Sequence, residues 1–233
     1  MKKILIIACT LFLLLPVGQA QNKRNKGSLE TVDGKMSSPA KGSVPVITVL
    51  PPPQQGLDAP LHVALEQRRT SRQFSEESLS PELLSGLMWS AYGYNRPNEH
   101  KRVAPSARNC QEYDIYLFTE QGGYRYDADK HSLTLVVDGD NRAVLSSQKF
   151  FATAPAIVLL VANYDRMKMF STPADRDFYA AVDGGYISQN IYLFCAAAEL
   201  GTVACGAIDR DAIHKLLNIT NGRAMLAHPV GKH

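Results

Sequence analysis

Apolar residues recur along the chain in two patterns, and together these predict a mixed structure of helices and strands from about residue 57 onward. Apolar residues three and four positions apart predict helices over residues 61–69, 83–91 and 209–217. The run Ser80-Pro81-Glu82 supplies a cap, an initial proline and an early acid for the second of these. Short apolar runs between turn residues predict strands. These runs cover residues 113–118, 123–126, 133–137, 156–161, 202–205 and 224–230.

A hairpin and one long helix stand out in this pattern. The pair Gly122-Gly123 predicts a tight turn between the first two strands. Residues 175–200 predict a helix whose second half is apolar on nearly every side, so we expect it to be buried in a core or in a dimer interface. Helices and strands do not alternate regularly, and the predicted fold class is therefore α+β.

The first 20 residues are typical of a secretory signal. Two lysines precede an apolar run over residues 4–17, and small residues follow with a cleavage point after Ala20. The apolar run is shorter than the roughly 20 residues that span a bilayer, which disfavours a permanent anchor. Lipidation at Cys9 is an alternative, but the apolar run continues beyond it. We expect an exported protein, periplasmic or secreted, with no membrane attachment after signal cleavage.

Residues 21–56 have the composition of a tether. They contain basic, Ser, Gly and Pro residues, and they end in a triproline over residues 51–53 that favours an extended spacer. The apolar stretch 46–50 can alternatively pack on the domain as an edge strand. The sequence thus predicts a signal over 1–20, a tether over 21–56 and a domain over 57–233.

Composition excludes several classes of protein. With 45% hydrophobic residues and a net charge of +3, the chain is neither disordered nor a general nucleic-acid binder. Residues 57–233 hold 18 basic and 20 acidic side chains, so the domain itself is slightly acidic. Any anion that it binds must be met by a local cluster of cations. Three cysteines remain after Ala20, so at least one lacks a partner within the chain, and buried packing is the favoured role.

The familiar catalytic and metal motifs are absent from the sequence. It has no GxGxxG, GxxxxGK[ST], GxSxG or HExxH, and its six histidines have no ligand spacing. The run 138–141 resembles a calcium loop but lacks the glutamate at the twelfth position, and a turn is favoured. We therefore expect no protein nucleophile and no metal site.

Three segments carry residue types suited to binding. Residues 68–72 hold three arginines, whose planar guanidinium groups donate paired hydrogen bonds to phosphate; a solvated helix end is the alternative. Residues 102–111 place Ser, Asn and Gln in a loop that can face a planar heterocycle or form an ordinary turn. Residues 183–207 are rich in Gly and Ala, which permit close approach by a helix or a ligand.

Together and in this order, the three segments resemble the FMN-dependent nitroreductase family, most nearly the branch that includes the azoline oxidases. The resemblance extends from Leu57 to the C-terminus. It includes residues 87–97, similar to a tryptophan-aromatic-Gly-x-Asn-Arg element, and the closing residues 228–232. It implies a nitroreductase-like FMN-binding fold, with a central, mostly antiparallel sheet flanked by helices. It also implies an interlocked homodimer with FMN at two interface sites.

The resemblance assigns phosphate and ring contacts to the basic residues. Arg68 resembles the phosphate-binding arginine, with Arg69 beside it, and Thr70 the hydroxyl near the ribityl chain. Arg72 takes the place of the cation beside the flavin N1–O2 edge, where it favours the reduced anion. Lys232 resembles the C-terminal cation that reaches the phosphate.

Uncharged positions complete the implied site. Asn109 resembles the amide that meets the pyrimidine edge of the ring, with Ser106 nearby. Gly206 and Ala207 resemble the segment whose backbone N–H approaches flavin N5.

The resemblance implies that the protein transfers a hydride from a reduced donor through the flavin to a nitroaromatic, quinone or similar small acceptor. We expect the donor to be NAD(P)H. Two alternatives stay open: an exported flavin carrier without turnover, and an oxygen-using oxidase of a small cyclic or peptide substrate. The azoline oxidases use an adjacent Lys-Tyr pair that this sequence lacks. Outside the cytoplasm NAD(P)H is not expected, so the physiological donor is open.

Overall fold

Most of the strands predicted from the sequence lie in one seven-stranded sheet in the computed structural model, which describes residues 46–53 and 59–233. Every neighbouring pair of strands in this sheet is antiparallel. From one edge to the other, the strands are β1 (Ile47–Val49), β6 (Ser132–Asp138), β5 (Gly122–Asp127), β4 (Tyr113–Thr119), β7 (Ala156–Asn163), β9 (Gly222–Gly231) and β8 (Gly201–Thr202).

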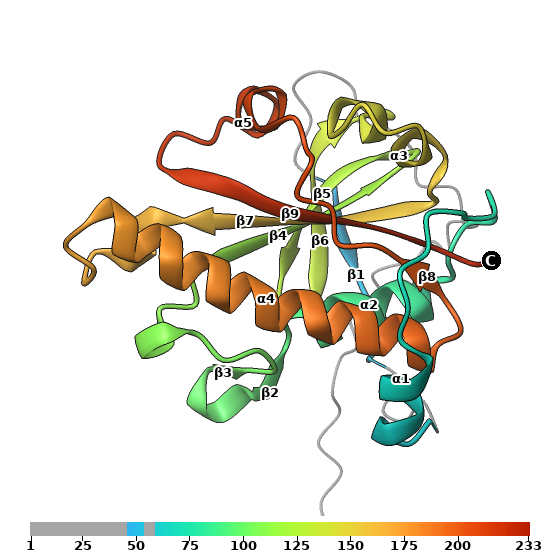
Figure 1. Cartoon of the computed structure of the whole chain (residues 1–233), viewed down its shortest axis with the longest axis horizontal. Helices are drawn as coiled ribbons and strands as arrows, with labels where there is room; N and C mark the ends of the chain where they lie inside the picture. Colours follow the sequence, from blue (N-terminus) through green and yellow to red (C-terminus); the bar gives the residue numbers. More distant parts are fainter. Residues whose placement is uncertain (1–45, 54–58) are drawn as a thin grey trace, which may run out of the picture. The chain divides into compact units, whose positions relative to one another are not determined.

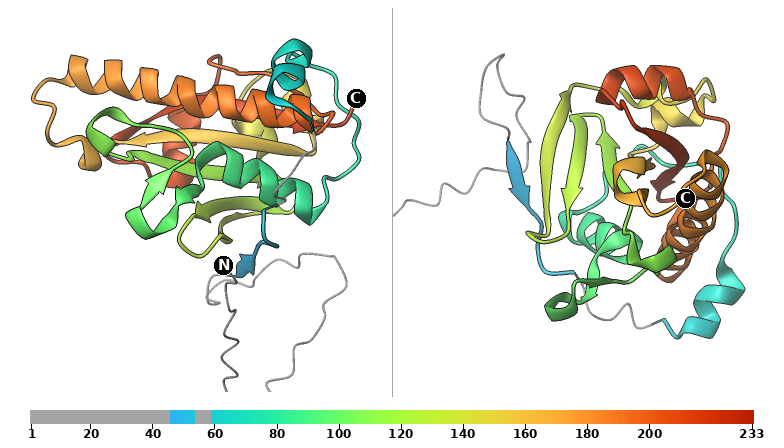
Figure 2. Two further views of the ribbon diagram at one scale, coloured as in Figure 1. Left: turned by 90° about the horizontal axis from the view of Figure 1, so that it is seen from below. Right: turned by 90° about the vertical axis from the view of Figure 1, so that its left-hand side faces the viewer.

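Helices cover both faces of the sheet, so the domain has three layers (Figures 1 and 2). The helices are α1 (Leu61–Gln67), α2 (Pro81–Tyr92), α3 (Phe150–Thr153), α4 (Pro173–Ala197) and α5 (Arg210–Leu217). Helices α2 and α4 pack on each other and on one face, while α3 and α5 lie on the other. A small second sheet pairs β2 (Tyr94–Arg96) with β3 (Lys101–Arg102). The α+β prediction is confirmed.

The central strands supply apolar side chains to two cores because successive residues of a strand point to opposite faces. In β4, Ile115 and Leu117 pack toward α2 and α4, whereas Tyr116 and Phe118 pack on the opposite side. All residues of β7 except the last are buried. This double burial explains why the strand reads as a continuous apolar run.

Helix α2 begins as its sequence predicts. The hydroxyl oxygen of Ser80 accepts a hydrogen bond from the backbone N–H of Leu83, and Pro81 occupies the first helical position.

The hairpin between β4 and β5 is also confirmed, but Gly122 and Gly123 lie in β5 and the turn is formed by Glu120 and Gln121. A Cβ on Gly123 would lie 2.6 Å from the Phe118 ring, so close packing requires the glycine there.

Only one side of α4 is buried within the chain. Ile187, Ile191 and Phe194 enter the core beside α2 and the sheet. The opposite side exposes Phe178 and Tyr186, at 62% and 47% respectively. An exposed apolar side on a long helix is a candidate surface for a second chain.

Residues 46–53, which the sequence predicts as part of the tether, belong to the folded part. Strand β1 pairs with β6, so the edge-strand alternative is confirmed and the fold starts before residue 57. The Nε2 atom of His131 lies 3.1 Å from the carbonyl oxygen of Pro51 and 2.7 Å from the hydroxyl of Ser85, which ties this segment to α2. The predicted signal, Cys9 and the rest of the tether lie outside the described residues, apart from the 46–53 segment.

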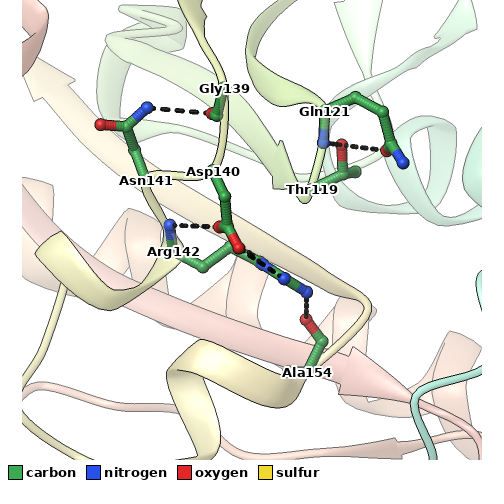
Figure 3. Close-up of polar contacts among 7 residues, drawn as sticks. All are labelled: Thr119, Gln121, Gly139, Asp140, Asn141, Arg142 and Ala154. Carbon is green, nitrogen blue, oxygen red and sulfur yellow. Dashed lines mark hydrogen bonds and ion pairs between the residues drawn. The ribbon is translucent and has the colours of Figure 1, made fainter.

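The 138–141 run forms a turn that holds an arginine (Figure 3). Gly139 has a φ of +70°, and Asn141 donates to its carbonyl oxygen. The buried guanidinium of Arg142 donates to both carboxylate oxygens of Asp140, at 2.9 and 2.7 Å, and to the carbonyl of Ala154. The Asp140 carboxylate therefore neutralises a protein cation here. No cluster of metal-ligating side chains occurs in residues 46–53 and 59–233.

The segment predicted as a strand over 202–205 is shorter than expected. Strand β8 ends at Thr202, and Cys205 makes only an isolated bridge to Ala227. The N–H of Ala204 is directed to the hydroxyl of Tyr192 instead of to a neighbouring strand.

Among the described residues, no helix is long and apolar enough to span a membrane.

Candidate functional site

The arginine-rich segment predicted to bind a phosphate follows α1 directly. Helix α1 ends because Arg68 has a ψ of 119°, although the N–H of Arg68 still donates to the carbonyl of Ala64. The guanidinium of Arg68 then lies over the ring of Tyr192, 5.2 Å from its centroid. The hydroxyl of Thr70 lies 3.1 Å from that of Tyr192. Both residues are thus held against the C-terminal part of α4.

The 201–207 segment lies beside this arginine-rich segment. The N–H of Ser71 donates to the carbonyl of Thr202 at 2.8 Å, and the N–H of Ala204 donates to the Tyr192 hydroxyl at 2.9 Å. Chain segments that are far apart in the sequence therefore meet at Tyr192. The structure brings Arg68 and Thr70 together with the segment that contains Gly206 and Ala207.

Gly206 and Ala207 present free backbone donors. Both residues are exposed, and no acceptor among the described residues takes either N–H. Their carbonyls are held: Ser146 donates to that of Ala207 at 2.8 Å, and Arg210 to that of Gly206 at 3.2 Å. A Cβ on Gly206 would meet only Leu226, at an ordinary 3.9 Å, so packing within the chain does not require glycine at this position.

The remaining cations of the prediction lie around the same region. The guanidinium of Arg72 is exposed, and its charge opposes the burial that raises the pKa of the Cys205 thiol. The ammonium group of Lys232 pairs with the exposed carboxylate of Glu77. Arg69 lines a pocket of about 350 Å³ at the end of α4. Its other lining residues are Gln67, Tyr192, Cys195, Ala196, Glu199, Leu200, Thr202 and His233.

The loop that carries Ser106 and Asn109 has an unusual backbone. Arg108, Asn109 and Gln111 all have positive φ, between 48° and 56°. Such conformations are uncommon for residues other than glycine and persist where surrounding contacts impose them. The Ser106 hydroxyl oxygen accepts from the N–H of Gln111 at 3.0 Å, and the Asn109 side-chain oxygen accepts from the Gln111 amide at 3.2 Å. Asn109 is exposed, and no acceptor among the described residues takes its amide N–H₂.

Two buried acids, Asp183 and Glu112, lie next to this loop, and one of them accepts a hydrogen bond from its backbone. The Asp183 carboxylate, on α4, accepts from the N–H of Ala107 at 2.7 Å. Glu112 is fully buried beside it, and no donor among the described residues reaches either carboxyl oxygen. Burial, with the nearby charge of Asp183, raises the pKa of Glu112 to about 7, and burial also raises the pKa of Asp183. Glu112 is therefore only partly ionised at neutral pH, because two adjacent buried carboxylates disfavour double ionisation.

Within one chain, the loop and the arginine-rich segment lie apart along α4. Asp183, which holds the loop, and Tyr192, which contacts Arg68 and Thr70, are nine residues apart. At about 1.5 Å and 100° per residue, this separation is roughly 13 Å along the axis and half a turn around it. Figure 1 accordingly shows α1 near the C-terminal end of α4, while β2 and β3 lie below its middle. A single chain does not gather all the predicted site residues in one place.

Sequence reasoning missed the residues that organise the site. Tyr192 has no motif around it, and its role appears only through contacts with distant segments. The sequence marks His228 only as part of the C-terminal element over residues 228–232. In the structure it is fully buried, 2.9 Å from the Ser188 hydroxyl, and burial lowers its pKa to about 3. Glu112 and Asp183 lie close to motif residues, which was the only available signal.

Residues 65–232 match the Nitroreductase family. A protein of Methanocaldococcus jannaschii that carries a provisional nitroreductase name is 32% identical over 183 residues, covering 74% of this chain and 90% of the relative.

Solved structures agree with this match. A structure from Ralstonia eutropha JMP134, described provisionally as a nitroreductase, has a TM-score of 0.76 and 32% identity, covering 86% of this chain and 96% of the other. A chain of the Escherichia coli microcin synthetase complex has a TM-score of 0.61 at 14% identity, covering 92% and 84%. A Clostridium acetobutylicum protein described provisionally as an NADH oxidase has a TM-score of 0.51 at 19% identity, covering 72% and 86%. The last two likenesses show a shared fold only.

Proposed function

The chain belongs to the nitroreductase family, and on this premise we propose that it is an FMN-dependent oxidoreductase. We propose NAD(P)H, or another reduced compound, as its electron donor, and a nitroaromatic, quinone or similar small molecule as its acceptor. When bound, FMN would supply the two-electron chemistry that side chains lack. The protein's own residues then have to bind the cofactor, orient it and leave room for the substrates.

The observation that carries this proposal is the pair of free backbone donors at Gly206 and Ala207. Their carbonyls are anchored while their N–H groups stay open, and no protein neighbour requires a glycine at 206. Donors held in this way suit the acceptor edge of a planar ring that comes close to the backbone. The nearby cations Arg68 and Arg72 suit the anionic end of the same ligand.

The contacts of the basic residues support the roles that we propose for them. Arg68 lies over the ring of Tyr192 and Thr70 contacts its hydroxyl, and the two residues would hold the phosphate and the ribityl chain. Arg69 would add positive charge, and Arg72 would meet the N1–O2 edge. Lys232 is paired with Glu77 at the surface, and exposed pairs of this kind contribute little, so the ammonium can exchange partners at small cost.

A second copy of the chain is part of this proposal. Ser106 and Asn109 lie away from the arginine-rich segment, so one protomer would contribute the loop and its partner the cations and backbone donors. The exposed apolar side of α4, with Phe178, Val182 and Tyr186, offers a surface for that partner. We also propose that residues 1–20 direct export, which leaves the physiological donor as the main open component of the reaction.

The visible spectrum of the purified protein tests the proposal. A yellow protein that NADH or NADPH bleaches anaerobically, and that a nitroaromatic or quinone then reoxidises, supports it. A yellow protein that no nicotinamide bleaches favours the carrier or the oxidase. A colourless protein that cannot be reconstituted with FMN refutes the flavin assignment.

A further inference from the structure

The side chain of Tyr192, on α4, joins the Arg68–Thr70 segment to the 204–207 segment. Its hydroxyl lies 3.1 Å from that of Thr70 and accepts from the N–H of Ala204 at 2.9 Å. Thr70 is in the segment proposed to bind the phosphate and ribityl chain. Ala204 lies two residues before Gly206, where the free backbone donors begin. One hydroxyl group thus connects both ends of the proposed cofactor site.

The ring of Tyr192 makes two further contacts. On one side the guanidinium of Arg68 lies 5.2 Å from the ring centroid, a geometry suited to a cation–π interaction. The imidazole of His228 meets the ring at 5.5 Å and an interplanar angle of 82°. The ring therefore contacts both an arginine at the site and a histidine of the core.

The His228 contact fixes the ring from the core side. His228 is fully buried in β9, and its Nε2 lies 2.9 Å from the Ser188 hydroxyl, one turn before Tyr192 on α4. Its Nδ1 lies 3.4 Å from the hydroxyl of Thr202, which donates to the carbonyl of Pro229 at 2.9 Å. Because His228 is buried and hydrogen-bonded, it cannot move away from the ring without leaving polar atoms unsatisfied, and it is therefore a fixed support for the ring.

We propose that Tyr192 is a positioning residue that fixes the distance between the Arg68 guanidinium and the backbone donors of residues 206–207. This inference rests on the proposed function, since FMN is the ligand that would contact both ends. The phosphate and the ring of FMN are held at a set separation by the ligand's own chain. A site whose cation and donors are already spaced to match loses less conformational freedom on binding.

Two substitutions separate the hydroxyl from the ring. Tyr192→Phe removes both hydroxyl contacts but keeps the ring beneath Arg68. Tyr192→Leu removes the ring as well. Tyr116→Phe is the matched control, because Tyr116 is a buried tyrosine in the opposite core.

The measurements are the dissociation constants for FMN and for riboflavin, the spectrum of the bound flavin, and the thermal stability of the protein without flavin. We expect Tyr192→Phe to weaken binding of both flavins about tenfold and to shift the flavin spectrum, with their affinity ratio unchanged. We expect Tyr192→Leu to lower the preference for FMN over riboflavin by a further factor of about three to ten, because Arg68 loses its support. Tyr116→Phe should bind both flavins as the wild type does.

Each outcome bears on one proposal. If the wild type binds FMN and both Tyr192 variants bind the two flavins unchanged, the positioning role is wrong while the proposed function stands. An unchanged FMN-to-riboflavin ratio in Tyr192→Leu refutes the link to Arg68. If Tyr192→Leu does not fold, Tyr192→Phe still decides the role of the hydroxyl. A wild type that binds neither flavin refutes the proposed function instead.

Discussion

Replacing Glu112 with glutamine tests the buried acid pair beneath the 103–111 loop. Glu112 is fully buried next to Asp183, and Asp183 holds the N–H of Ala107. Burial, together with the charge of Asp183, raises the pKa of Glu112 from 4.5 to about 7, while Arg166 opposes that rise. Glutamine keeps the size and hydrogen-bonding capacity of the protonated acid but cannot ionise.

The direction of the effect follows from proton binding. Between pH 4.5 and 7 the folded protein keeps a proton on Glu112 that the unfolded chain has released, so stability falls as pH rises through this window. A rise of the pKa from 4.5 to about 7 contributes about 3 kcal/mol to the free energy of unfolding at low pH. Most of this contribution, about 2 to 3 kcal/mol, is lost as the pH rises from roughly 5 to 8. Glu112→Gln should not show this loss.

Urea unfolding at several pH values from 5 to 8 measures the difference. The two proteins should be similarly stable at pH 5, and the variant should be more stable by about 2 kcal/mol at pH 8. Glu120→Gln, at an exposed turn position, is the control and should show no growing difference. A constant difference between Glu112→Gln and the wild type across this range would refute the reasoning, since it would mean that Glu112 does not titrate in this window.

Four further substitutions test the proposed site and the second chain. Gly206→Ala should leave the stability of the flavin-free protein unchanged or slightly higher, because its Cβ meets only Leu226 at 3.9 Å, but should weaken FMN binding measurably by titration; unchanged affinity contradicts close ligand approach. Arg68→Ala should weaken FMN retention, and Arg72→Ala should chiefly lower the flavin's reduction potential; identical behaviour of both variants would contradict their separate roles. Phe178→Asp should shift sedimentation from dimer to monomer, since a charge would replace a side chain that is 62% exposed on α4. A dimer that persists in Phe178→Asp would exclude this face.

The helices and strands agree best with the sequence predictions where the signal comes from residues close together in the sequence. Ser80 caps α2 because its side chain reaches a donor three residues away, and a sequence shows that spacing directly. The apolar run of β7 fixes its burial on both faces. The strand predicted over residues 202–205 was too long, because the N–H of Ala204 donates to a tyrosine on α4. That tyrosine is distant in the sequence, so no local pattern indicated the contact.

The candidate site also has features that the sequence indicated and features that only the structure shows. Residue types singled out the 68–72 and 183–207 segments, and the family resemblance then assigned roles to Arg68, Arg72 and Gly206 within them. No local pattern indicated that Tyr192 would join them, or that Glu112 would lie beside Asp183, 71 positions later. Both arrangements depend on the position of α4 against the sheet.

The sequence by itself determined the α+β class, most of the elements and the chemical types at the site. These follow from side-chain periodicity, caps and charge, which act over a few residues. Tertiary structure alone decided which face of α4 holds each group, and it placed the loop with Asn109 and the segment with Arg68 on opposite sides of that helix. The physical reason is that helix packing and antiparallel pairing join distant segments, and those contacts have no signature in local sequence.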